Sequence, residues 1–469
     1  MKKKITSFLL IILLGVLIFT GCGFTALKGG PAKADPVTSN GGLVVQKGSY
    51  LYYVSGYTET GALTEGSNKY GNVKLSAIYR SPLNADGTIK KDENGNNIAE
   101  ILAPKVVGFE NGGFYIFGDK IYYATPNTEK GNDGKINFEK TDFYESSLDG
   151  TNVRRLYKTT VGSTKFQFAF YQVESEVYLA VYDSADLYVV KASDKSVNKI
   201  ATGVSSVVLP RLLENNTVEQ PSLQGYQYLY YTRNIDTEKE SDESAKRGNV
   251  LAMANIKSQE EIVVSLNSTY AVKDFKNDTL IFTKRGLNEE NACYYMAKFE
   301  IANEEANIKM SDMVQLSYQA FSTDPIVLDF EDGYRGMIIK NESGYLTYIK
   351  MPQGGLPVSE VLTTETTLTP IAVYNNYVFA YNADKELYMI KYNDPEKALI
   401  KLTNKDNDTL SFDMNLNVDF NNGYVYFYKS FTGDEKSAYY LVRLDTTKLE
   451  NFETELVGTL LKEHIKTEE

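Results

Sequence analysis

The sequence predicts an all-β protein built from a repeated strand unit. Segments rich in tyrosine, phenylalanine and β-branched residues recur along a chain of 469 residues that contains 36 tyrosines and 22 phenylalanines. These residue types are typical of strands. No long stretch of the body of the chain has the 3.6-residue periodicity of an amphipathic helix. Glycine, asparagine and aspartate separate the segments, which indicates tight turns between antiparallel strands.

The repeated unit is clearest at residues 114–157. It begins with an apolar strand, a tight turn at Gly118-Asp119-Lys120 and a Tyr-rich second strand. A polar loop, a third strand, the turn at 149–152 and a short fourth strand follow. The four strands are expected at 114–117, 121–124, 143–148 and 153–157.

The same order recurs in seven further units. Their second strands are expected at 50–53, 176–181, 228–231, 279–282, 336–339, 377–381 and 424–428. Third strands are expected at 78–84, 186–191, 345–350, 386–391 and 438–445.

A four-strand unit that recurs every 40–55 residues or so is typical of a β-propeller. We therefore expect residues 43–461 to form a propeller of four-stranded antiparallel blades, eight in number. Seven blades are the alternative if one of the fourth to sixth units is an insertion. An elongated β-solenoid or two β-sandwiches are the alternative folds. The chain begins this region with a first-strand-like segment at 43–46 and ends it at 455–458, so we expect closure without strand exchange between the ends.

The N-terminal region predicts an export signal followed by a lipid anchor. Three lysines precede an apolar run at residues 8–19, and Thr20-Gly21 leads into Cys22. The run has the length of a signal-peptide core and is too short to span a bilayer. The motif resembles the lipobox of bacterial lipoproteins, which implies cleavage of residues 1–21 and acylation of Cys22. An uncleaved anchor or an ordinary signal peptide is the alternative.

The segment after Cys22 reads as a spacer. Residues 22–42 are small, spaced by glycine and proline, and lack periodicity, so we expect a flexible tether. Residues 462–469 form a charged C-terminal tail.

The order Tyr-Tyr, loop, Leu/Ile-Tyr-Arg/Lys and Asp-Gly resembles a Tyr-rich bacterial β-propeller lipoprotein family. That family is likened to the propellers of low-density-lipoprotein-receptor proteins and more distantly to TolB-like propellers. The resemblance covers most of 43–461, and it implies an extracytoplasmic propeller of unknown ligand. It is weaker in the fourth to sixth units, which lack the Asp-Gly. The residues that carry it best are Tyr122-Tyr123, Phe143-Tyr144 and Asp149-Gly150, together with Tyr52-Tyr53 and Ile78-Tyr79-Arg80.

Charge and cysteine content argue against a nucleic-acid partner and against stabilisation by a disulfide bond. The formal net charge is −12, and cleavage before Cys22 would take it to −15. Nucleic-acid binding needs clustered lysine and arginine, so we expect no nucleic-acid partner. The chain has two cysteines. With Cys22 lipidated, Cys293 would have no intramolecular partner, and its apolar neighbours predict a buried, unreactive thiol.

The usual catalytic constellations are not found in the sequence. The single histidine, His464, lies in the charged tail, which excludes His-based triads and His-based zinc sites in the propeller. Ser196 and Lys199 have S-x-x-K spacing without partner motifs. Residues 92–97 (DENGNN) have alternating oxygen ligands but lack the glycine and glutamate positions of a calcium loop, so we interpret them as a hairpin turn. The acidic segment 236–243 is interpreted as a solvated loop.

These observations predict a lipid-anchored, extracytoplasmic propeller that binds without catalysis and holds no cofactor. We expect an envelope protein, a peptide or a non-acidic glycan as partner, bound at a loop-bearing end of the ring through exposed tyrosines. A carboxylate-based glycan hydrolase or lyase is the alternative, since two carboxylates suffice for that chemistry. An accessory subunit that acts only through protein contacts is a third hypothesis.

Overall fold

The structure is a computed structural model, and its described part consists almost entirely of strands. The described residues are 42, 44–55, 77–103, 113–127, 129, 132, 134, 140–159, 166–210, 226–234, 249–265, 270–276, 279–285, 292–302, 305–315, 326–327, 335–351, 358–374, 376–384, 386–402, 410–412, 419–421, 424–431, 438–445 and 455–457. Within them, no helix is long and apolar enough to cross a membrane.

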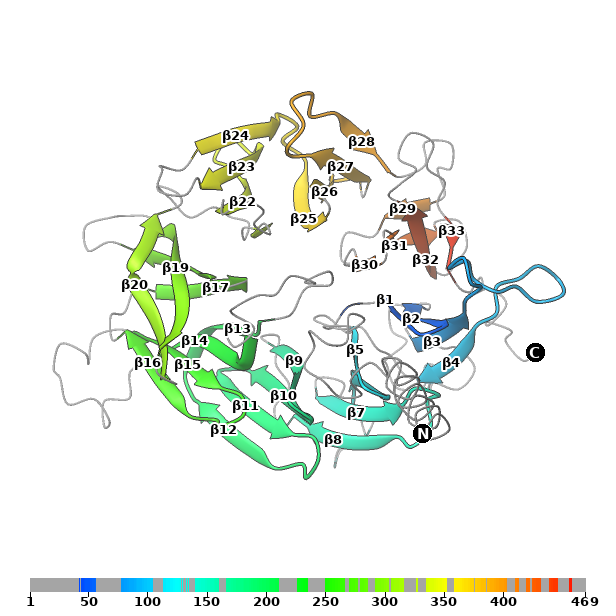
Figure 1. Cartoon of the computed structure of the whole chain (residues 1–469), viewed down its shortest axis with the longest axis horizontal. Coiled ribbons are helices and arrows are strands. Elements are labelled where there is room, and N and C mark those ends of the chain that lie inside the picture. The colour runs from blue at the N-terminus through cyan, green and yellow to red at the C-terminus, as the bar shows by residue number, and fades with distance from the viewer. Residues whose placement is uncertain are drawn as a thin grey trace, which may run out of the picture.

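The strands form eight antiparallel sheets arranged around a ring (Figure 1). Sheet 1 contains β1 (Val44–Lys47), β2 (Tyr50–Ser55), β3 (Ala77–Pro82) and β4 (Glu100–Ala103). Sheet 2 contains β5 (Phe114–Phe117), β6 (Lys120–Pro126), β7 (Thr141–Ser147) and β8 (Arg154–Lys158). Sheet 3 contains β9 (Phe166–Val173), β10 (Glu176–Asp183), β11 (Asp186–Lys191) and β12 (Val197–Ala201). Sheet 4 contains β13 (Val204–Val208), β14 (Tyr228–Asn234), β15 (Asn249–Asn255) and β16 (Glu261–Ser265).

The second half of the ring continues in the same order. Sheet 5 contains β17 (Tyr270–Lys276), β18 (Thr279–Arg285), β19 (Ala292–Ala302) and β20 (Glu305–Gln315). Sheet 6 contains β21 (Ile326–Val327), β22 (Arg335–Lys340), β23 (Leu346–Met351) and β24 (Val358–Thr363). Sheet 7 contains β25 (Thr369–Tyr374), β26 (Tyr377–Tyr381), β27 (Leu387–Lys391) and β28 (Leu399–Lys401). Sheet 8 contains β29 (Leu410–Phe412), β30 (Asp419–Asn421), β31 (Tyr424–Phe431), β32 (Ala438–Asp445) and β33 (Glu455–Leu456).

The fold is therefore a β-propeller of four-stranded antiparallel sheets, as the sequence predicts. Each expected second strand is the second strand of a sheet, and the fourth to sixth units form sheets 4, 5 and 6 although they lack the Asp-Gly turn. The solenoid and sandwich alternatives are wrong. The number of blades in the closed ring stays a prediction.

Sheets 5 and 8 each have a feature that the repeat did not indicate. In sheet 8, β29 and β30 both pair with β31, so this sheet has five strands. In sheet 5, β19 and β20 are 11 residues each, which makes their hairpin longer than the usual unit.

Aromatic side chains fill the spaces between neighbouring sheets. Between sheets 2 and 3, Phe143 meets Phe168 edge to face, with ring centroids 5.2 Å apart. Tyr115 meets Phe170 in the same way at 5.2 Å. All four rings are nearly or fully buried in one apolar cluster. Large flat side chains bury much apolar area per residue, which explains why this chain is rich in tyrosine and phenylalanine.

Sheets 1 and 8 meet at what we call the seam, where the two ends of the propeller come together. Strand β1 contacts β30, and β2 contacts β32. Tyr426, Leu441 and Val457 of the last sheet join the apolar cluster of sheet 1. Each sheet takes its described strands from one continuous part of the chain, so no strand is exchanged across the seam.

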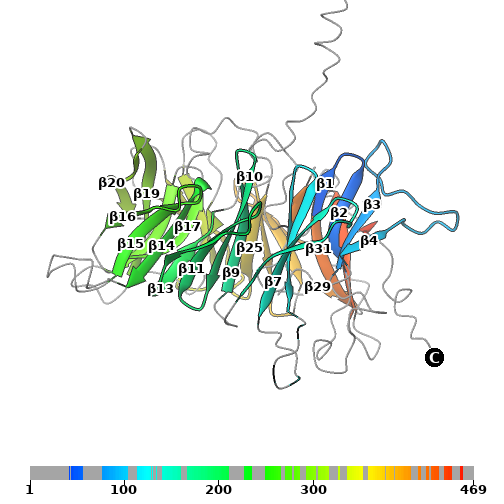
Figure 2. The ribbon, with the colours of Figure 1, turned by 90° about the horizontal axis from the view of Figure 1, so that it is seen from below.

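The strands run between two ends of the ring (Figure 2). We call one the turn end, because connections from first to second and from third to fourth strands lie there. We call the other the loop end, because second strands end there and third strands begin there. A single-residue bridge joins Gly42 to Phe114, the first residue of β5.

Candidate functional site

Polar side chains gather at the loop end of sheet 2. They come from the end of β6, the connection after it, the start of β7 and strand β8. Because residues alternate between faces of a strand, Asp142 lies on the face of β7 opposite to buried Phe143. Register pairing places Asp142 opposite Lys158 on the neighbouring strand. We call Asn127, Glu129, Asp142, Arg155 and Lys158 the loop-end cluster.

The loop-end cluster is joined by hydrogen bonds and ion pairs. The amide Nδ2 of Asn127 donates to Asp142 Oδ2 at 2.9 Å. Arg155 Nη1 lies 3.7 Å from Asp142 Oδ1 and also donates to Glu129 Oε1. Lys158 Nζ donates to Glu129 Oε2 at 2.6 Å. Asp142 and Asn127 are buried, whereas Glu129, Arg155 and Lys158 reach solvent.

The electrostatics of this cluster keep the Glu129 carboxyl group ionised. Hydrogen bonds from Arg155 and then Lys158 lower the pKa of Glu129 to about 2. A glycosidase general acid needs the opposite shift, since its carboxyl must stay protonated near neutral pH. The negative charges of Glu129 and Asp142 are balanced by the positive charges of Arg155 and Lys158. The cluster can therefore donate and accept hydrogen bonds without presenting a strong net charge.

Carboxyl groups elsewhere show the same direction of shift. Asp149 accepts hydrogen bonds from the backbone and hydroxyl of Thr151, at 3.0 and 2.6 Å, which lowers its pKa. A hydrogen bond from Lys401, the largest cause, lowers the pKa of Glu386 to about 2. Seven described carboxyl groups have a pKa below its ordinary value. They are Asp86, Asp92, Glu129, Asp149, Asp194, Glu365 and Glu386.

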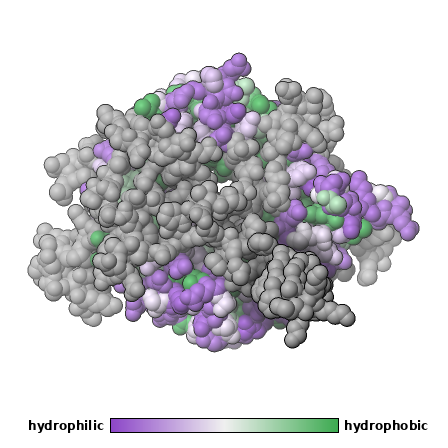
Figure 3. Space-filling view, viewed as in Figure 1, coloured by the Kyte–Doolittle hydropathy of each residue, from purple (hydrophilic) through white to green (hydrophobic). Residues whose placement is uncertain are grey.

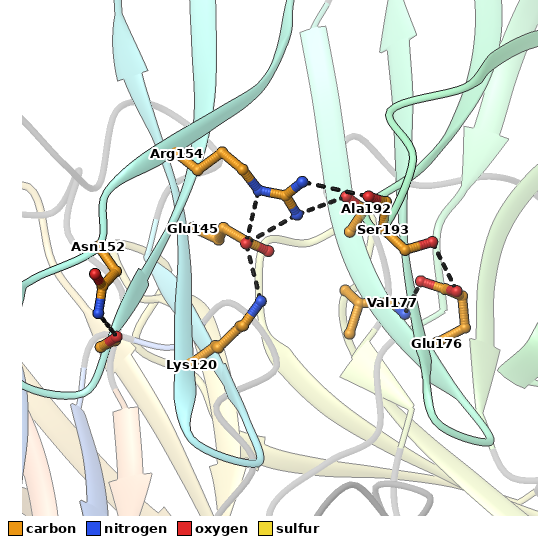
Figure 4. A network of polar contacts seen from close by, with 9 residues as sticks. Lys120, Glu145, Asn152, Arg154, Glu176, Val177, Ala192 and Ser193 are labelled. Carbon is orange, nitrogen blue, oxygen red and sulfur yellow. Dashed lines mark hydrogen bonds and ion pairs between the residues drawn. The ribbon is translucent and has the colours of Figure 1, made fainter.

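A second polar network joins sheets 2 and 3 at the turn end (Figure 4). Glu145 is buried, and its Oε1 accepts hydrogen bonds from Lys120 Nζ and Arg154 Nε, both at 2.9 Å. Ser193 Oγ donates to Glu176 Oε2 at 2.8 Å on the other side of the interface. Arg154 also donates to the carbonyls of Ala192 and Ser193, so this network joins the two sheets.

Several residues singled out from the sequence have structural roles. Cys293 is buried in β19 with 2% of its surface exposed, as predicted. Ser196 lies in the turn before β12, where its backbone N–H donates to Asp194 at 2.8 Å. Lys199 pairs with Asp186 at 2.7 Å. This arrangement uses the lysine of the S-x-x-K spacing in a surface ion pair.

The segment 92–97 is a hairpin turn, as interpreted from the sequence. The backbone N–H of Asp92 donates to the carbonyl of Asn96 at 2.7 Å, and Lys91 bridges to Asn97. The side chain of Asp92 accepts the backbone N–H groups of Asn94 and Asn96. Its oxygens are thus engaged within the turn.

The expectation that exposed tyrosines form the binding surface is not supported. Every tyrosine whose burial the structure describes is buried or half-buried. The physical reason is that tyrosines on second strands pack between sheets, as Tyr123 does in the apolar cluster that it shares with sheet 1. Cys22, His464 and the segment 236–243 lie outside the described residues.

The surface offers few other candidates. On the face seen in Figure 3, the described surface is mainly hydrophilic, and its apolar residues lie in separate small areas. In the described part, large apolar side chains that are exposed lie mainly on the fourth strands, for example Val197 and Val263, and scattered exposure of this kind is ordinary for a protein surface. In the described part of the chain, no three His, Cys, Asp or Glu side chains are placed to hold a metal ion.

The sequence reasoning missed the loop-end cluster. The period-two pattern could have placed Asp142 and Tyr144 on one face of a strand. Nothing in the pattern indicated that Glu129, from a polar loop, would join Arg155 and Lys158.

Comparisons with known proteins show no family for this chain. No family model matches the sequence, and no curated protein matches it. The β-propeller domain of the Trilobed protease from Pyrococcus furiosus is 11% identical, over 75% of this chain and 95% of that domain, with a TM-score of 0.40. Oligopeptidase B from Leishmania major is 10% identical over 74% of this chain, with a TM-score of 0.44, and TolB from Acinetobacter baumannii is 9% identical over 72%, with a TM-score of 0.30. This chain spans 48% of the length of oligopeptidase B and 63% of that of TolB.

Proposed function

We propose that this protein is a membrane-anchored, extracytoplasmic lipoprotein whose propeller binds a partner without catalysis. The anchor is the lipidated Cys22, and the loop end of the ring is the binding face. Propellers suit this role because connections vary at the ends while the sheets stay rigid. The loop-end cluster supplies exposed polar groups held in fixed positions on that face.

One observation carries the non-catalytic part of the proposal. The pKa of Glu129, an exposed carboxyl group of the loop-end cluster, is lowered to about 2 by hydrogen bonds from Arg155 and Lys158. A carboxylate-based hydrolase or lyase needs at least one acid kept protonated. This supports a binding role over acid catalysis for Glu129.

The charge of the protein limits the class of partner that it is expected to bind. The loop-end cluster balances Glu129 and Asp142 against Arg155 and Lys158, while a mature chain would carry a net charge of −15. Long-range repulsion then disfavours polyanions. An envelope protein, a peptide or a neutral or basic glycan fits best, and nucleic acid does not.

Replacement of Cys22 tests the anchor. Cys22→Ser should move the protein from the membrane fraction to the soluble fraction or leave it unprocessed, because two or more acyl chains are needed for stable anchoring. Mass spectrometry of the wild-type protein should show an N-terminus at a lipidated Cys22. An intact Met1 N-terminus would contradict the anchor and leave the binding proposal untouched.

Matched lysine variants test the binding face. Lys158→Gln removes an ion pair at the loop end, whereas Lys257→Gln removes the exposed pair with Glu174 at the turn end and changes net charge equally. The full-length protein in detergent should bind at least one member of a panel of neutral and basic cell-wall glycans and envelope peptides. We expect Lys158→Gln to weaken this binding several-fold and Lys257→Gln to leave it unchanged.

Two outcomes would contradict this proposal. Equal effects of the two lysine variants would remove the loop-end cluster from the binding face. Product formation that Asp142→Asn abolishes would replace the binding module by the glycan hydrolase or lyase.

A further inference from the structure

Sheets 1 and 8 contain the same arrangement of four side chains. Arg80 and Arg443 each lie on a third strand, opposite a glutamate of the fourth strand in the pairing register. The Nε of Arg80 donates to Glu100 at 2.7 Å, and the Nε of Arg443 donates to Glu455 at 2.7 Å. Each guanidinium also lies over a tyrosine ring, at 4.7 Å from the Tyr50 centroid and 4.4 Å from the Tyr424 centroid.

Each of these arginines also reaches into the next sheet of the ring. Arg80 Nη1 donates to the carbonyl of Leu148 in sheet 2 at 3.2 Å. Arg443 Nη1 donates to the carbonyl of Gly87 in sheet 1 at 3.3 Å, although the two residues are 356 positions apart in sequence. Both acceptors lie in the turn between third and fourth strands, where the Asp-Gly pair occurs.

Sheet 2 makes the same contact with the charges exchanged. Its third strand carries Glu145 and its fourth strand carries Arg154, which are register partners. Arg154 Nη2 donates to the carbonyl of Ala192 at 2.8 Å, and Nη1 donates to that of Ser193 at 3.3 Å (Figure 4). These acceptors belong to the corresponding turn of sheet 3. In all three sheets, an arginine paired with a glutamate donates a hydrogen bond to the turn of the following sheet. The arginine lies on the third strand in sheets 1 and 8 and on the fourth strand in sheet 2.

The consequence of losing this contact differs between interfaces. Sheets 1 and 2 follow one another in the chain, so the backbone keeps them close when Arg80 is lost. Sheets 8 and 1 lie at opposite ends of the propeller sequence and exchange no strand. Arg443 is only 2% exposed there, and a charge-assisted hydrogen bond in a buried site is among the stronger polar contacts.

We propose that Arg443, held by Glu455, is a latch that closes the ring by fixing the turn of sheet 1 at Gly87 to sheet 8. The ring opens at this seam in preference to any other interface when the latch is removed. The apolar cluster of Tyr426, Leu441 and Val457 with sheet 1 packs the seam, and the latch sets its alignment at the turn end.

The test compares Arg443→Gln with Arg80→Gln by hydrogen exchange of the full-length protein. Both variants remove one arginine with a glutamate partner, a tyrosine ring and a carbonyl in the next sheet. In Arg443→Gln we expect exchange to rise on the order of tenfold or more in β1, β2, β31 and β32, while other sheets keep their protection. In Arg80→Gln we expect the seam strands to stay protected.

A charge-exchanged variant keeps the proposal testable if Arg443→Gln fails to fold. Sheet 2 shows that arginine on the fourth strand can hold the next turn, so Arg443→Glu with Glu455→Arg should restore protection of the seam strands. Either single replacement should not. Seam exchange in Arg443→Gln equal to wild type, equal opening in Arg80→Gln, or no recovery in the charge-exchanged variant would overturn the latch.

Discussion

Replacement of Gly150 by alanine tests how tightly sheets 1 and 2 meet at the turn end. Gly150 lies in the turn after β7 with a φ of +79°, and its N–H donates to Ser147 at 2.9 Å. A Cβ placed there would come within 2.6 Å of the carbonyl oxygen of Leu102 in sheet 1. This contact is with backbone, so no side-chain rotation can relieve it.

Gly87 provides a matched control for backbone strain. It occupies the corresponding turn of sheet 1 with a φ of +81°, and a Cβ there would meet nothing within 4 Å. Alanine in a left-handed conformation costs about 1–2 kcal/mol. Overpacking adds typically about 1–3 kcal/mol. Gly87→Ala should therefore carry only the strain, and Gly150→Ala should carry both terms.

Equilibrium denaturation of both variants measures the difference. We expect Gly150→Ala to lower the free energy of unfolding by about 1–3 kcal/mol more than Gly87→Ala does. A double variant should lose the sum of the two effects, because the turns lie in different sheets. Equal losses in the two single variants would show that sheets 1 and 2 are not in close contact at Gly150, and the reasoning from inter-sheet packing would be refuted.

Much of the fold can be predicted from local sequence because the apolar pattern of each strand reflects which of its faces are buried. Residues 121–124 and 228–231 are unbroken runs of apolar and aromatic residues, as expected for a strand buried on both faces, and both segments belong to second strands. The fifth strand of sheet 8 could not be predicted. Its segments β29 and β30 are only three residues each, too short for a pattern, and they are defined by pairing with β31.

The candidate site depends on contacts between distant residues, which is why the sequence did not indicate it. Glu129 lies in a polar loop, and its partners are Arg155, 26 residues on, and Lys158, 29 residues on. The Asp-Gly pair that carries the family resemblance is explained only by the three-dimensional structure. Asp149 caps the turn, and Gly150 allows close approach of the neighbouring sheet.

Two further predictions concern the whole ring. A chain truncated after Asp419 loses β31–β33, most of β30 and the seam contacts of Tyr426, Leu441 and Val457, so it should fail to unfold cooperatively in a denaturant titration; a stable cooperative domain would contradict a closed ring. Alkaline pH should unfold the protein, because burial raises the pKa of Tyr79 and Tyr157 to about 12, against an ordinary value of about 10. The sign follows from linkage: above pH 10 the unfolded chain loses phenolic protons that the folded chain retains, so the stability present below pH 10 is lost as pH rises toward 12. Phenolate absorbance and far-ultraviolet circular dichroism followed together should show the buried tyrosines ionising in one cooperative step with loss of the sheets. Gradual ionisation of all tyrosines near pH 10 with the sheets intact would mean that their hydroxyls are not desolvated between the sheets.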